Sequence, residues 1–190
     1  MAAQYNTRAL DGEWPHPIEV SHKTKSGMGL IRSRSGRDRK PIYERKLSIE
    51  EVHNRIERYW RPYHDALRDH LDSTHAAFGA AWHINCHSMP SKWATGFEKA
   101  GEPNENDYVL GNRDGTTAGA EFTELVRETL AGFGFHVGIN DGQKGVELVR
   151  AYSDPSEERH SLQIEINRRL YWDERNMKKR EGHFEEQQAI

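Results

Sequence analysis

The six residues LQIEIN at positions 162–167 decide the fold, because apolar and polar side chains alternate along them. A period of two residues is typical of a β-strand, whose successive side chains point to opposite faces of a sheet. Gln163, Glu165 and Asn167 therefore share one face, and the two isoleucines lie on the other. The stretch predicts a strand with a carboxylate in its middle.

That carboxylate, Glu165, is the first candidate for chemistry. Between two isoleucines it is poorly solvated, so we predict that its pKa is raised or that Arg168 or Arg113 is its cationic partner. A carboxyl group with a raised pKa can act as a general base near neutral pH. An edge strand with one solvated face fits the same pattern, so both interpretations stay open at this point.

Outward from this strand, the sequence predicts helices and strands in alternation. Ser48 and Glu51 form a capping-box pattern before an amphipathic stretch, which Pro62 interrupts. The expected elements are a helix over 48–74 kinked near Arg61, strands over 80–86 and 107–110, a helix over 118–132, a strand over 135–139, and a polar helix from about Trp172. Such alternation favours an α/β fold around a largely parallel sheet.

The composition excludes several classes of protein. The chain has 190 residues, one cysteine and a formal net charge of −3. A single cysteine excludes a disulfide framework, and no apolar run reaches the ~20 residues of a membrane span. The small negative charge gives no general attraction to nucleic acid or to anionic lipid. Since no apolar leader opens the sequence, we expect a cytoplasmic protein that binds neither nucleic acid nor membrane.

The first 46 residues differ from the rest, with few aliphatic residues and a basic stretch over 32–46. We expect an extended or poorly ordered arm here, and we place a boundary between an arm at 1–28 and a domain at 29–190. A basic arm that binds nucleic acid is the alternative, although two acidic residues interrupt the stretch. A further irregular loop is expected over 91–106.

Polar residues follow three of the expected strands, at 85–88, 112–114 and 140–141. Ligands of open α/β sheets bind beyond the carboxyl ends of the strands, so these clusters are candidate site residues. His87 is the candidate metal ligand, and Asn85 on the same face can hydrogen-bond its ring. A lone histidine is often structural, and His83 lies ~13 Å away along the strand, too far to bind the same ion.

Other candidates carry less weight. Cys86 adjoins His87, but neighbouring side chains of a strand point to opposite faces, so we expect a buried structural cysteine rather than a nucleophile. Two H-x-x-E pairs, at 16–19 and 183–186, have a spacing that suits metal ligands. Pairs of this kind are expected by chance in a chain with 11 histidines and 30 acidic residues.

Five segments in a fixed order carry a resemblance to a known family. They are YWRPYHDAL at 59–67, INCHSMP at 84–90, DYVLGNR at 107–113, Ile139-Asn140, and LQIEINRRLY at 162–171. Together they resemble the N-formylglutamate amidohydrolases from about residue 29 to residue 174. The elements HSMP and QIEINR, in this order, are the specific ones.

The resemblance implies a three-layer α/β/α fold with a mostly parallel, mixed sheet of the phosphorylase/hydrolase-like kind, related to zinc carboxypeptidases. It also implies hydrolysis of the formyl amide of N-formyl-L-glutamate to formate and glutamate, in histidine catabolism. The cofactor would be zinc or another divalent metal, which lowers the pKa of its bound water and polarises the carbonyl.

By the same resemblance, His87 corresponds to a zinc ligand and Glu165 to the carboxylate that activates the metal-bound water. Arg113 and Arg168 match family arginines and suit the carboxylates of a glutamyl substrate, since a guanidinium binds a carboxylate through two hydrogen bonds. His64, Asn85 and Asn140 are expected to support these residues, with His64 in the wall or packing of the site.

The sequence also departs from the family pattern. The family's aspartate before the Cys-His-Ser element is Asn85 here, and the family's N-terminal segment, with its first strands and further metal ligands, is expected to be absent. One metal ligand alone would hold zinc weakly. The alternative function is therefore a degenerate member that acts as a binding or interaction module. A sheet edge left open would favour a homo-oligomer.

Overall fold

A computed structural model of the protein describes residues 10–15, 20–35, 39–91 and 106–182. The chain divides into an N-terminal unit, residues 1–67, and a C-terminal unit, residues 68–190. The boundary predicted at 28/29 separates an arm from a domain, whereas this one separates two compact units. The arm boundary stays a prediction. Both H-x-x-E pairs and positions 92–105 of the expected loop lie outside the described ranges.

The N-terminal unit contains short elements around a small core. Strand β1 (Leu10–Asp11) pairs in parallel with β4 (Leu47–Ser48), and β2 (Arg34–Ser35) pairs antiparallel with β3 (Lys40–Pro41). Helix α1 spans His22–Lys25. The buried side chains of the core are Ile31, Leu47, Val52 and Ile56. Residues of the basic stretch thus form a two-stranded ladder, and Ile31 next to that stretch is buried.

The capping box at Ser48 is confirmed, and a π-helical turn interrupts the regular helix just before Pro62. The Ser48 hydroxyl accepts from Glu51 N–H at 3.2 Å, while the Glu51 carboxylate accepts from Ser48 N–H at 2.8 Å. Helix α2 (Ile49–Arg55) continues through a π-helical turn, η2 (Ile56–Trp60), into α3 (Arg61–Phe78). The helix thus runs to Phe78, four residues past the predicted end at 74, and Pro62 does not terminate it. The helix widens by one residue before Pro62, which has no N–H to donate, and then continues.

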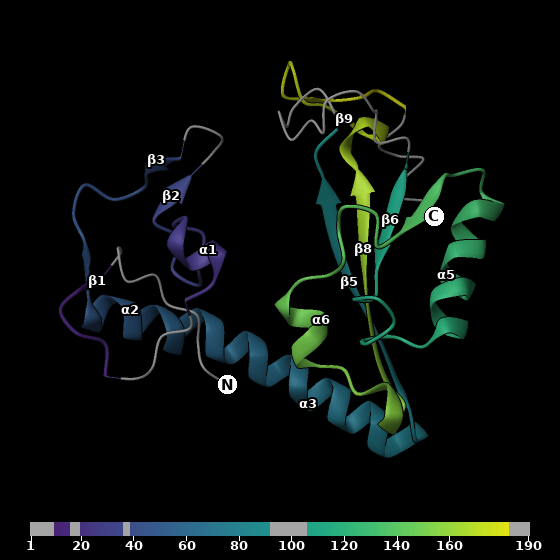
Figure 1. Ribbon diagram of the computed structural model, residues 1–190, viewed down its shortest axis with the longest axis horizontal. Coiled ribbons are helices and arrows are strands. Elements are labelled where there is room, and N and C mark those ends of the chain that lie inside the picture. Colours follow the sequence, from purple (N-terminus) through teal and green to yellow (C-terminus); the bar gives the residue numbers. More distant parts are fainter. Residues whose placement is uncertain (1–9, 16–19, 36–38, 92–105, 183–190) are drawn as a thin grey trace. The chain divides into compact units, whose positions relative to one another are not determined.

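The C-terminal unit holds one four-stranded sheet in the order β5-β8-β6-β7 (Figure 1). The strands are β5 (Ala81–Met89), β6 (Tyr108–Gly111), β7 (Val137–Ile139) and β8 (Arg159–Asn167). β5 is parallel to β8 and β6 to β7, whereas β6 and β8 are antiparallel. The α/β class with a mostly parallel, mixed and open sheet is confirmed. The interpretation of 162–167 as an edge strand was wrong, because β8 lies between two other strands.

Helices supply the core that packs on this sheet. α5 (Ala120–Gly132) runs along the β6–β7 side of the sheet (Figure 1), and its Leu130 joins Leu110 and Leu162 in the buried cluster. Shorter helical turns are α6 (Glu147–Ala151), η3 (Pro155–Glu157) and η4 (Arg168–Leu170). In the described ranges, no helix is both long enough and apolar enough to cross a membrane.

Strand β5 extends further than predicted and is more exposed. It continues to Met89, so His87 lies inside the strand rather than after its end. Cys86 is exposed, which corrects the expectation of a buried cysteine. The reason is its position: β5 is an edge strand, and Trp82 and Ile84 on the same face are also 56% and 44% exposed.

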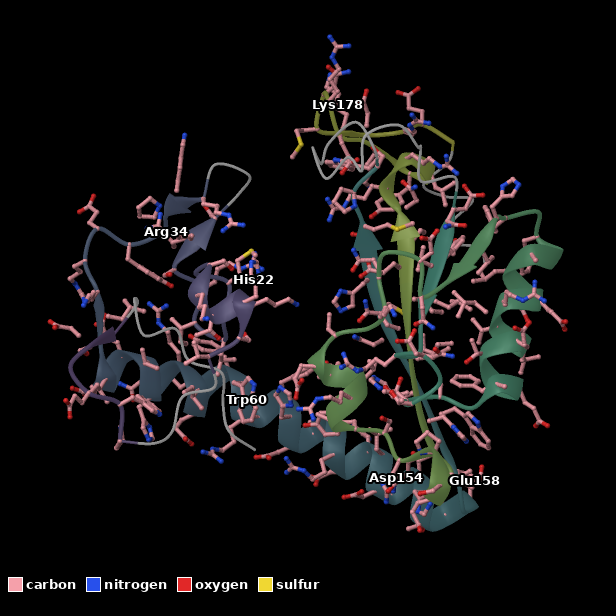
Figure 2. All side chains as sticks on the ribbon, in the orientation of Figure 1. His22, Arg34, Trp60, Asp154, Glu158 and Lys178 are labelled. Atoms are coloured by element: carbon pink, nitrogen blue, oxygen red, sulfur yellow. The ribbon has the colours of Figure 1, made fainter. Side chains whose placement is uncertain are left out.

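Residues 172–179 form a hairpin where a polar helix was expected. β9 (Trp172–Asp173) pairs antiparallel with β10 (Lys178–Lys179). The Asp173 carboxylate accepts from the N–H groups of Arg175 and Asn176, both at 3.0 Å, and this local turn competes with a helix. Figure 2 shows Lys178 of this hairpin at one end of the sheet and Asp154 and Glu158, which precede β8, at the other.

Candidate active site

The parallel register of β5 and β8 brings the main candidate residues together on one face. His87 lies beside Glu165, Asn85 beside Gln163, and His83 beside Ser161. Because side chains alternate along both strands, these three pairs project from the same side of the sheet. The predicted metal ligand and the predicted base are thus direct neighbours.

Glu165 is almost completely buried in the middle of this face, with 5% of its surface exposed. Gln163 Nε2 donates to its Oε1 at 2.8 Å, and His87 Nδ1 lies 3.8 Å from the same oxygen. Within the described part of the chain, no group donates a hydrogen bond to Oε2 of this carboxylate. One oxygen is therefore held in place and the other can accept a proton.

Burial raises the pKa of the Glu165 carboxyl above its ordinary value, because the charged form loses solvation. The nearby His87 ring, the Gln163 hydrogen bond and the charge of Arg168 each lower this pKa, but by less than burial raises it. The raised pKa predicted from the alternating sequence is confirmed, and it makes this carboxylate a stronger base than an ordinary glutamate.

Gln163 is a residue of this site to which the sequence argument gave no role. It is fully buried, and its Oε1 accepts from Val146 N–H at 2.9 Å and from Asn85 Nδ2 at 3.5 Å. With both ends of its amide bonded, Gln163 connects Glu165 to the loop before α6. The amide of Asn85 therefore bonds Gln163, whereas a bond to the His87 ring was expected. The alternation of the sequence predicted that Gln163 and Glu165 share a face. It could not predict that Gln163 bonds Val146 and Asn85, which lie on other elements.

A close approach of two backbones places the Val146 N–H. A Cβ on Gly111 would lie 2.6 Å from Gly145 N and 2.7 Å from the Lys144 carbonyl carbon, so only glycine fits at position 111. Arg113 N donates to Lys144 O at 2.8 Å, and Arg113 Nη1 donates to Gly145 O at 3.1 Å. The loop at 144–146 is thus clamped against the end of β6.

Asn140 supports this clamp from the end of β7. Its Nδ2 donates to Asn112 Oδ1 at 2.7 Å, and its Oδ1 accepts from Asn112 N–H at 3.2 Å. Asn140 and Arg113 both have a positive φ, of 55° and 50°, which marks two tightly turned strand ends. In this structure Asn140 holds the backbone next to Arg113.

The two candidate arginines lie on opposite sides of Glu165 along β8. Because β6 runs antiparallel to β8, Arg113 is on the Gln163 side, whereas Arg168 follows the other end of the strand. The idea that the carboxyl ends of three strands share one site was therefore wrong for the clusters at 112–114 and 140–141. These clusters follow strands that point the other way.

Arg168 is held by residues around it. Its Nε donates to Ser88 Oγ at 3.1 Å, its Nη2 to Ser88 O at 3.3 Å, and its Nη1 to Glu174 Oε1 at 3.2 Å. Glu174 also accepts from the backbone N–H of Ser91 at 2.7 Å and from the Ser91 hydroxyl. These bonds connect the end of β5 to the residues after β8 and fix the guanidinium near Glu165.

Two other histidines have local partners. His83 Nδ1 lies 2.8 Å from Ser161 Oγ, and burial lowers the pKa of its ring. His64, expected to support the site, belongs to the N-terminal unit, where its ring lies 4.1 Å from that of Trp60. His87, by contrast, lies beside Glu165, with 3.8 Å between its Nδ1 and the carboxylate Oε1.

The described residues fit a general base better than a complete metal site. A hydrolytic zinc site takes three protein ligands, and the described ranges bring together no group of three or more His, Cys, Asp or Glu side chains that could hold an ion. His87 is one available imidazole. The arrangement can remove a proton from a nucleophile and present cations on either side.

An open α/β sheet with a buried carboxylate beside an imidazole is an arrangement typical of hydrolytic enzymes. Comparison with protein families is more specific: the family described as N-formylglutamate amidohydrolase matches residues 6–172. The chain therefore belongs to the N-formylglutamate amidohydrolase family, as the resemblance of its motifs indicated.

Individual relatives agree with this assignment. The N-formylglutamate deformylase of Pseudomonas putida is 30% identical over 137 residues, which cover 70% of this chain and 50% of that protein. The deformylase of Pseudomonas aeruginosa is 28% identical over 140 residues, covering 72% and 51%. The crystal structure of N-formylglutamate amidohydrolase from Ralstonia eutropha JMP134 has a TM-score of 0.89 and 41% identity, over 99% of this chain and 67% of that one. The chain spans about half the length of the curated relatives.

Proposed function

We propose that this chain hydrolyses the amide of an N-acylated acidic amino acid, with N-formyl-L-glutamate as the preferred substrate. The observation that carries the proposal is Glu165, a buried carboxylate with a raised pKa at the centre of a sheet face in a chain of this family. The products would be formate and glutamate, the relatives' names supply the substrate, and its use in histidine catabolism is part of the same proposal.

In the proposed reaction Glu165 takes a proton from the attacking water and returns it to the leaving amine. Gln163 holds Oε1, so the proton goes to Oε2. The amide carbon gains the water oxygen and loses the nitrogen, and the proton that Glu165 carries completes the free amino group. His87, 3.8 Å from Oε1, is near enough to bind the same nucleophile.

Arg113 and Arg168 are the proposed partners of the substrate carboxylates. Their positions on opposite sides of Glu165 fit a substrate with two carboxylates. Arg168 would exchange one of its present bonds, to Ser88 or Glu174, for a bond to substrate. Arg113 is bonded to Gly145 O through Nη1, which leaves its other N–H groups for a ligand.

Zinc, or another divalent metal, is the cofactor that the family resemblance implies, and His87 would be one of its ligands. The described residues supply one imidazole at this site, fewer than the three ligands that hydrolytic zinc takes, so on their own they do not fit it. The proposed proton transfers therefore involve only Glu165 and its neighbours. A bound metal requires further ligands besides His87.

Formate release tests the proposal directly. We expect the chain to release formate from N-formyl-L-glutamate and to release less from N-formyl-L-leucine, which has one carboxylate instead of two. Formate is measured with a coupled dehydrogenase, with and without added Zn²⁺, and bound zinc is measured in the same samples. No formate under either condition, with less than about 0.1 zinc per chain, would contradict the proposal and favour a binding module.

The raised pKa of Glu165 predicts the pH dependence of this activity. The base must be deprotonated, so kcat/KM is expected to be full above the pKa of Glu165 and to fall as pH drops through it. Because burial raises this pKa, the fall should come at a higher pH than an ordinary glutamate gives. A rate profile in the free enzyme measures it, and an acid limb at or below the ordinary glutamate value would argue against Glu165 as the base.

A further inference from the structure

The N-terminal unit contains a hollow that the proposed reaction does not use. Its volume is about 730 Å³, within the range of about 300–1,000 Å³ that small-molecule sites occupy. The buried side chains of Ile31 and Ile56 form part of its lining, and Leu30 and Ile42 extend the apolar surface. The described residues that line it come from positions 30–63, within the N-terminal unit.

Aromatic rings form much of the wall. Tyr43, Tyr59, Trp60 and Tyr63 all line the hollow, and Figure 2 shows Trp60 on the helix that carries three of them. Tyr59 and Tyr63 are 72% and 53% exposed, so their rings are accessible to a ligand that enters the hollow. Rings on several sides suit a ligand with a flat aromatic or a branched apolar body.

Two arginines give the hollow a positive charge. Arg32 and Arg55 line it, and among the residues that the structure describes neither makes an ion pair. Arg55 is fixed in place, because its Nη1 donates to the Tyr43 hydroxyl at 2.6 Å and its guanidinium carbon lies 5.1 Å from the centre of the Tyr43 ring. A guanidinium held beside apolar walls is a ready partner for an anionic group.

Two acidic residues of the adjoining helix, Glu51 and Glu57, are already paired with other arginines. Glu51 binds Arg45 through two hydrogen bonds of 2.8 Å, and Glu57 binds Arg61 through two of 2.7 Å. Among the residues that the structure describes, no aspartate or glutamate lines the hollow. Charge complementarity therefore favours an anion here.

We propose that this hollow is a binding site for a small organic anion with an aromatic or branched apolar body, its acid group on Arg32 and Arg55 and its body against Trp60 and the tyrosines. Arg32, the first residue of the basic stretch over 32–46, then binds the acid group of the ligand. The proposal does not depend on the proposed reaction, because none of the described lining residues takes part in it.

Binding of 8-anilinonaphthalene-1-sulfonate, an aromatic anion of this size, tests the proposal in the full chain. We expect one molecule per chain, with a rise in dye fluorescence and energy transfer from the tryptophans, of which Trp60 lines the hollow. The double variant R32Q/R55Q should raise the Kd at least about tenfold, since it removes two charged donors. The matched control is Arg58→Gln, which removes an exposed arginine of the same helix that does not line the hollow, and it should leave the Kd within about twofold.

Two further measurements separate this site from other dye binding. The neutral analogue N-phenyl-1-naphthylamine should bind the unchanged chain more weakly than the sulfonate does. In R32Q/R55Q the two dyes should bind with about equal affinity. Ile84→Ser, on the exposed face of β5, should leave sulfonate binding unchanged. Equal affinity in the unchanged chain and R32Q/R55Q, with both folded by circular dichroism, would overturn the proposal. So would loss of binding in Ile84→Ser, which would place the dye on the strand face.

Discussion

Glu165→Gln is expected to lower kcat for formate release from N-formyl-L-glutamate by about two to four orders of magnitude, the range that a positioned general base contributes. Glutamine keeps the shape of the side chain and can still pair with Gln163 by rotating its amide. It has no affinity for the proton that Oε2 would take. KM should change little, because the substrate carboxylates are assigned to Arg113 and Arg168.

The matched control for this variant is Glu147→Gln. Glu147 is an exposed glutamate on α6 that pairs with Arg150, and its loss should leave kcat within about twofold, as is usual for surface substitutions. The zinc content of both variants is measured alongside. Lower zinc in Glu165→Gln than in the unchanged chain would make Glu165 a metal ligand instead of a base. Activity close to that of the unchanged chain would remove Glu165 from the mechanism.

The local pattern of the sequence was enough to predict strand β8 and the raised pKa of Glu165. Alternation at 162–167 placed Gln163 and Glu165 on one face, and both lie there, in the strand Arg159–Asn167. Capping signals likewise predicted the start of α2, because the hydrogen bonds of a capping box lie within four residues. These features depend on residues a few positions apart, so the amino-acid sequence alone is enough to predict them.

Strand direction and edge position could not be read in the same way. The antiparallel pairing of β6 with β8 separates Arg113 from Arg168, and nothing within either strand encodes the direction of its partner. The exposure of Cys86 has the same origin, since a short apolar run looks alike in an edge strand and in a central one. The role of Gln163 depended on Val146, 17 residues earlier, and on the fit of Gly111 against Gly145.

The hydrogen bonds of Gln163 lead to the second prediction with a large effect, a loss of activity in Gln163→Met. Gln163→Met keeps the volume of the side chain but removes its bonds to Glu165 and Val146. We expect kcat/KM to fall about 10- to 100-fold, as is usual when a residue that orients a catalytic group is lost. The Val146 N–H loses its acceptor, so the free energy of unfolding should fall by about 1–2 kcal/mol.

The pH profile separates orientation from packing in this variant. The Gln163 hydrogen bond lowers the pKa of Glu165, so its removal should raise that pKa further and move the acid limb of kcat/KM to higher pH. Asn85→Ala is the control: Asn85 bonds Gln163 but not Glu165, and its loss should leave the limb in place. If Gln163→Met is less stable but its acid limb does not move, Gln163 only packs the sheet. A limb that moves in Gln163→Met alone would show that this buried amide sets the protonation of the base.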